Sequence, residues 1–221
     1  MDMTLNWQSL AGQPVFYLFV GVTFLLAYGY FHGRRRNREI VTNAFSELAE
    51  VIRPVDQTYT NIGGAIGYHA VMTPDAESVV AKAEATLTLL PRQAWLYLPI
   101  SLLLRRWDRL YLMLGLRHTP PAEGHLIEAA YGRFRGPSIT NERHMTQESV
   151  RWGDRDFNLM YTTKNTRKHF MRLMEQLPSP DGIKHLAFVP HQKRCFVFIV
   201  PSRRAVKSSL APVLNWLQTV V

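Results

Sequence analysis

The chain has 221 residues, and its composition excludes a disordered tail, because 47% of the residues are hydrophobic and 11% are aromatic. That is enough apolar material for one membrane helix and one globular core. The net charge of +9 favours anionic lipid or RNA as partners. A solvated basic face beside an anionic membrane explains the charge equally well. The single cysteine, Cys195, excludes an internal disulfide and a multi-cysteine metal site.

The stretch 14–31, PVFYLFVGVTFLLAYGYF, carries no charged side chain and predicts a membrane-spanning helix. A helix of about 20 apolar residues crosses a hydrocarbon core of roughly 30 Å. We therefore expect a short extracytoplasmic tail over 1–13 and a transmembrane helix over 14–32. The alternatives are a buried core helix and a cleaved signal peptide. A signal peptide is disfavoured because its basic residues should precede the apolar run, and here they follow it.

Basic residues directly after the apolar run set the expected orientation, because cytoplasmic flanks of membrane helices are enriched in Lys and Arg. The arginines that we expect to contact the membrane or phosphate groups are Arg34, Arg35, Arg36, Arg38, Arg105 and Arg106. The N-terminus should lie outside and the remaining chain in the cytoplasm. The membrane is the cell membrane, or the endoplasmic reticulum membrane in a eukaryote.

The remaining sequence predicts an α+β fold, with a basic juxtamembrane helix over 33–54 and a cytoplasmic mixed strand and helix domain over 55–221. Glycines in the sequence TNIGGAIGYHAVM suggest a bulged or close-packed strand and not a phosphate loop. Apolar and polar residues alternate over 79–89 and again after Asp108, so both segments should be half-buried strands.

The segment AWLYLPISLLL, residues 94–104, is uncharged but too short to span a bilayer unaided. We interpret it as a buried or interfacial helix that Pro99 kinks. In the alternative interpretation, Trp95, Leu96 and Leu98 enter the membrane surface. Trp95, Leu98 and Leu102 are the predicted interfacial or client-contacting residues.

The second half of the chain begins with an irregular region, 118–153, in which we expect a short helix over 123–131. The elements expected after it are a strand at 156–161, a helix at 166–177, a hairpin of strands at 185–189 and 195–200, and a helix through 206–217. Cys195 lies in an apolar run and should be an inert core thiol.

No catalytic, cofactor or metal motif is apparent in the sequence. The eight histidines stand at positions 32, 69, 118, 125, 144, 169, 185 and 191. None of them pairs at helical spacing in a ligand pattern, so we interpret them as scattered surface residues. We therefore expect a non-enzyme with no cofactor and no metal.

The order of these elements resembles the cytosolic domain of calumin, the coiled-coil-domain-containing protein of the endoplasmic reticulum translocon and its PAT chaperone complex. The residues that carry the resemblance are Arg92 and Gln93 before the apolar segment, Asp108 before the next strand, and Phe198, Val200 and Pro201 at the end of the hairpin. By this resemblance the chain is a short relative of prokaryotic or archaeal type that lacks the coiled-coil tail.

The resemblance implies a non-catalytic accessory or chaperone that assists membrane protein insertion near the translocon and ribosome. Its implied partners are membrane lipids, a translocon or insertase, a small multi-pass membrane protein and ribosomal RNA, but not DNA. A membrane-tethered scaffold that binds another membrane protein is the alternative. A third interpretation is a membrane-bound enzyme with a site assembled from His125, Glu128, Asp154 and Asp156.

Overall fold

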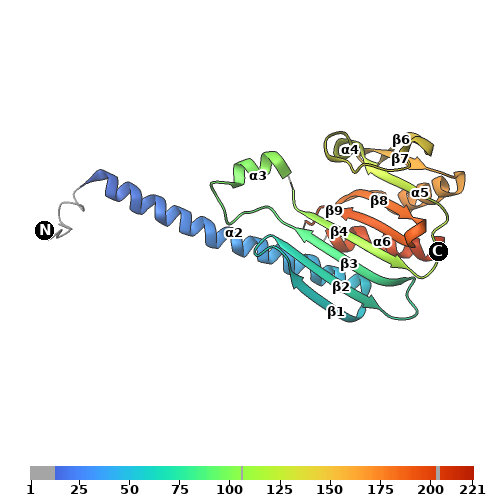
Figure 1. Cartoon of the computed structure of the whole chain (residues 1–221), viewed down its shortest axis with the longest axis horizontal. Coiled ribbons are helices and arrows are strands. Elements are labelled where there is room, and N and C mark those ends of the chain that lie inside the picture. The colour runs from blue at the N-terminus through green and yellow to red at the C-terminus, as the bar shows by residue number, and fades with distance from the viewer. Residues whose placement is uncertain (1–12, 106, 203–204) are drawn as a thin grey trace.

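The computed structural model describes residues 13–105, 107–202 and 205–221, and it joins one long helix to a nine-stranded sheet (Figure 1). The helices are α2 (Pro14–Ile52), α3 (Leu98–Arg105), α4 (Ala129–Arg135), α5 (Lys164–Gln176) and α6 (Ala205–Val220). The strands are β1 (Pro54–Asn61), β2 (Gly67–Pro74), β3 (Val80–Thr88), β4 (Arg109–Leu116), β5 (Gly124–Glu128), β6 (Thr146–Trp152), β7 (Arg155–Tyr161), β8 (Ile183–Val189) and β9 (Arg194–Ile199).

The strands form a single sheet in the order β1-β2-β3-β4-β9-β8-β5-β7-β6, and every neighbouring pair is antiparallel. Strand β9, near the end of the sequence, lies between β4 and β8 and so joins the first half of the chain to the second. The fold is a mixture of helices and antiparallel sheet, which confirms the predicted α+β class.

The helix α2 has 39 residues and is about 58 Å long at 1.5 Å per residue. It is the one described helix that is long and apolar enough to cross a membrane, and only 6% of its apolar window is buried. Its second half behaves differently, because Ala44, Phe45, Leu48 and Ile52 are buried in the core of the domain. The predicted membrane segment and juxtamembrane helix are therefore one uninterrupted helix.

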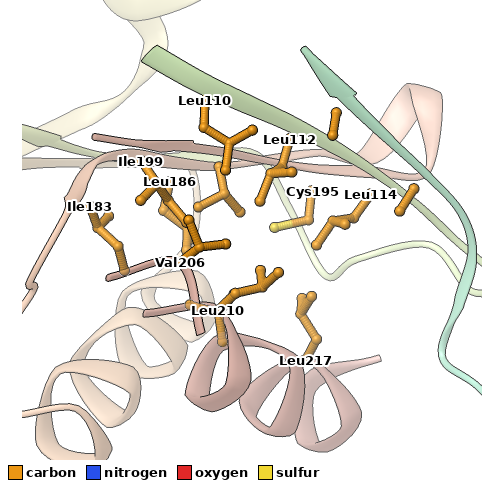
Figure 2. Packing of buried hydrophobic residues seen from close by; sticks show 14 of the residues in the cluster. Leu110, Leu112, Leu114, Ile183, Leu186, Cys195, Ile199, Val206, Leu210 and Leu217 are labelled. Carbon is orange, nitrogen blue, oxygen red and sulfur yellow. The ribbon is translucent and has the colours of Figure 1, made fainter. Parts of the chain in front are cut away.

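The core lies between the sheet and the helices α2, α5 and α6. In β4 the side chains alternate as predicted, with Leu110, Leu112, Leu114 and Leu116 buried. Figure 2 shows leucines of β4 and residues of β8 and β9 pointing toward α6. Cys195 is fully buried among them, which confirms the predicted core thiol.

The prediction of a bulged or close-packed strand in TNIGGAIGYHAVM is confirmed only in part, because this sequence covers the end of β1, a hairpin turn at 62–66 and most of β2. Gly64 has a φ of +60°, which glycine adopts easily. The side chain of Asn61 closes the turn: its amide donates to the Gly64 carbonyl at 2.7 Å, and its oxygen accepts from the Gly63 N–H. Strand β1 itself was not expected.

Two further expectations need correction. The segment predicted as a helix over 123–131 begins as β5, which is buried at every position, and only then continues as α4. Pro99 does not kink the apolar segment, because it lies in the first turn of α3, where a proline needs no hydrogen-bond partner for its nitrogen. The predicted strand at 156–161, the helices at 166–177 and 206–217, and the terminal hairpin are confirmed within a few residues.

Candidate functional site

A cluster of polar residues fastens the sheet domain to the long helix, and we call Asn37, Arg92 and Asp108 the junction. The guanidinium of Arg92 donates to both carboxylate oxygens of Asp108 at 2.8 Å. It also donates to the Asn37 side-chain oxygen at 3.0 Å. Asp108 is 6% exposed and accepts a third hydrogen bond, from the Leu90 N–H at 2.8 Å. This bidentate pair fixes the chain that leaves β3 against the start of β4.

Asn37 connects the same cluster to α2. It is 1% exposed, and its amide donates to the Leu90 carbonyl at 2.9 Å and to the side chain of Gln93 at 3.3 Å. A buried amide is costly unless its hydrogen bonds are satisfied. The helix position and the loop conformation are therefore mutually dependent.

Two glycines of α2 allow the loop after β3 to touch the helix directly. A methyl group built on Gly33 would lie 2.0 Å from the Arg92 carbonyl oxygen, and one built on Gly29 would lie 2.4 Å from the indole of Trp95. Neither distance is compatible with a side chain. Trp95 also packs edge-on against Tyr28, with ring centroids 6.3 Å apart. The loop therefore packs directly on the last apolar turns of α2, and we call this contact at Gly29 and Gly33 the seat of the loop.

The segment 94–104, which we call the shoulder, follows this seat and includes most of α3. Figure 1 shows α3 at the end of the sheet from which α2 extends. The shoulder is apolar and largely exposed: the exposed fraction is 80% for Leu96, 52% for Ile100 and 57% for Leu104. Of the predicted contact residues, Leu102 is exposed, whereas Trp95 and Leu98 are half-buried.

The predicted arginines of α2 lie just beyond the shoulder contact. The four residues Arg34, Arg35, Arg36 and Arg38 are exposed. Arg35 and Arg36 pair with Glu39 at 3.3 and 3.4 Å, and such exposed pairs leave the guanidinium groups largely hydrated. Arg106 and the side chain of Arg105 lie outside the described part of the chain.

The hairpin residues singled out by the sequence have packing roles. Phe198 is fully buried and contacts the rings of Tyr111 and Tyr131 at 4.9 and 5.1 Å between centroids. Pro201 is buried and Val200 is half-buried. Pro201 also borders a cleft of about 330 Å³ beside Arg36 and the junction.

Two histidines contradict the interpretation of scattered surface residues. His125 on β5 and His185 on β8 are 8% and 4% exposed, and their rings meet at 3.2 Å between Nδ1 and Nε2. Burial lowers the pKa of both, and for His185 burial together with the neighbouring His125 lowers the pKa to about 3. No sequence signal pairs these residues, because only the strand order places β5 beside β8.

The four residues of the enzyme interpretation do not converge on one site. His125 contacts His185 and Glu123, whereas Glu128 pairs with Arg155 and Lys184. Asp154 reaches Arg155 from the solvent side, and Asp156 pairs with Arg151 at 4.0 Å. Among the described residues, no three His, Cys, Asp or Glu side chains are grouped as metal ligands would be.

Neither a protein-family model nor a curated protein matches this sequence. Function is therefore inferred from the residues and their geometry, and the resemblance to calumin stays a prediction.

Proposed function

We propose that the protein is a single-pass membrane protein whose helix crosses the bilayer over residues 14–32. The N-terminus lies outside and the sheet domain lies in the cytoplasm, at the cell membrane or, in a eukaryote, at the endoplasmic reticulum. The exposed apolar side chains of the first half of α2 support this placement, because water would solvate them poorly. The arginine cluster at 34–38 supports the orientation.

We further propose that it is a non-catalytic accessory or chaperone for membrane protein insertion beside the translocon and ribosome. The observation that carries this proposal is the shoulder, an exposed apolar surface that the contact of Trp95 with Gly29 places beside the apolar half of α2. An apolar surface at this level can guide apolar segments of other proteins into or within the bilayer. The proposed partners are translocon or insertase subunits and a small multi-pass protein. The exposed arginines at 34–38 would contact ribosomal RNA.

A membrane-tethered scaffold is the second candidate, and strand β1 favours it. This strand forms one edge of the sheet, and its side chains are exposed on both faces, with Val55 at 77% and Tyr59 at 49%. An exposed edge can accept a strand from another protein. The enzyme is the third candidate, and its four residues do not meet in one cluster.

The test is recovery of the tagged full chain from its native membrane in mild detergent, at low and high salt, with mass spectrometry of the bound proteins. Recovery of translocon or insertase subunits, and of ribosomal proteins lost at high salt, supports the accessory. A Val55→Lys and Tyr59→Lys variant separates the two candidates. If that variant loses the proteins that the wild type recovers, the protein is a scaffold that binds through β1.

A further inference from the structure

The shoulder has the polarity of a helix that faces lipid. In α3, Ser101 is 2% exposed and points into the protein, whereas Ile100, Leu102 and Leu104 are 52%, 44% and 57% exposed. A helix on the surface of a soluble domain shows the opposite arrangement, with apolar residues inside and polar residues outside. This inverted pattern is expected where the surrounding solvent is hydrocarbon.

We propose that residues 94–104 form a second membrane element, a short segment that does not cross the bilayer and whose exposed apolar side chains enter the lipid leaflet on the side of the sheet domain. This inference rests on the proposed crossing of the membrane by α2. In this proposal, lipid acyl chains contact the exposed side chains of the shoulder.

The depth of the shoulder follows from its contacts with α2. Trp95 packs on Gly29 and the Arg92 backbone on Gly33, so Trp95 lies about 8 Å along the helix, less than two turns, from the arginines that start at Arg34. Arginines favour the headgroup layer, and tryptophan favours the boundary between headgroups and acyl chains. The contact with Gly29 therefore places Trp95 at that boundary.

The shoulder also continues the apolar surface of α2. On α2, the side chains of Leu25, one turn before Gly29, and of Tyr28, which contacts Trp95, are 55% and 64% exposed. Residues 94–104 contain no acidic or basic side chain. A charge-free surface that adjoins a membrane-crossing helix matches acyl chains better than it matches water.

The experiment places a fluorescent label on single introduced cysteines in the full chain, reconstituted in vesicles of phosphatidylcholine and phosphatidylglycerol. The labelled variants are Leu96→Cys, Ile100→Cys and Leu104→Cys. Leu25→Cys is the reference inside the membrane, and Thr58→Cys on β1 is the reference in water. Native Cys195 is fully buried and does not compete for the label in the folded protein. Quenching by a nitroxide on the lipid acyl chain is compared with quenching by aqueous iodide.

The proposal expects the three shoulder labels to follow the Leu25 label, with lipid quenching at least twofold above that of the Thr58 label and little quenching by iodide. Shoulder labels that follow Thr58 while Leu25 is quenched by lipid would overturn the inference and leave the crossing by α2 intact. Shoulder labels protected from both quenchers would assign the surface to contact with a second copy of the chain, the only protein in the vesicles, and overturn the lipid assignment. A Leu25 label that iodide quenches would overturn both the crossing and the inference.

Discussion

Arg92 and Asp108 show how single residues couple the two parts of the molecule. Their bidentate pair is partly buried, with side-chain exposures of 23% and 7%, and it shares Asn37 with α2. Removal of one partner leaves the other charge in a poorly hydrated site, which is more costly than the loss of an exposed pair.

We expect Arg92→Met to lower the free energy of unfolding by about 3 kcal/mol, because Asp108 would keep its buried charge without a cation. Urea unfolding of the purified full chain in detergent measures this change. The matched control is Arg35→Met, since Arg35 is 83% exposed and its loss should change the free energy by less than about 0.5 kcal/mol. Equal effects of the two substitutions would show that the junction does not stabilise the domain.

The buried histidine pair should make the domain sensitive to acid. The pKa of His125 and His185 is lowered in the folded state, so below about pH 6.5 the unfolded chain binds protons that the folded chain excludes. The free energy of unfolding is therefore not reduced by these histidines above that pH, and it falls as the pH drops from 6.5 toward 3. The expected slope is up to about 1.4 kcal/mol per pH unit for each proton.

Unfolding curves at several pH values measure the slope in the wild type and in His185→Gln. We expect the substitution to reduce this slope, because only one buried histidine then remains to bind a proton on unfolding. The exposed His191 offers the control, and His191→Gln should leave the slope unchanged. An unchanged slope in His185→Gln would contradict the role assigned to the buried pair.

At the scale of elements, the sequence predicts best where burial on one side leaves a pattern. Strand β4 alternates between buried leucines and half-buried residues, and α5 has its apolar residues at helical spacing, so both were predicted. Strand β1 was missed because it is exposed on both faces, and β5 because it is buried at every position. Neither arrangement gives the alternation that identifies a strand.

The candidate site was predictable only in part, for the same reason. An uncharged segment between arginines indicates an interfacial helix, and the resemblance to calumin singles out Arg92 and Asp108. The contact with Gly29 and Gly33, and the buried polar role of Asn37, depend on how the loop folds back on α2. Such long-range packing leaves no local signal in the sequence.

The seat of the loop on α2 requires glycine at position 33. A methyl group there would lie 2.0 Å from the Arg92 carbonyl oxygen, whereas one at Gly21 has no neighbour within 4 Å. We therefore expect Gly33→Ala to displace the loop and to speed proteolytic cleavage within residues 94–104 of the detergent-solubilised chain. Gly21→Ala is the control and should leave the cleavage rate unchanged. Equal rates in all three proteins would contradict this contact.

In the whole molecule, the shoulder is exposed, so substitutions there should impair function without unfolding the domain. We expect the combined Leu96→Ser, Ile100→Ser and Leu104→Ser variant to unfold within about 1 kcal/mol of the wild type, because these side chains bury little area in the domain. Leu112→Ala is the contrasting variant, and it should cost about 2–5 kcal/mol because Leu112 is fully buried in the core. A large loss of stability in the serine variant would make the shoulder an ordinary part of the core.

The proposed role of the protein in the insertion of other membrane proteins can be measured in cells. The most direct measurement is the fraction of a newly made multi-spanning membrane protein that becomes resistant to carbonate extraction in cells that lack this chain. We expect a reduced fraction that the wild type restores and the triple serine variant of the shoulder does not, although both accumulate to the same level. Insertion that is unchanged without the chain, or that the serine variant restores fully, would contradict it.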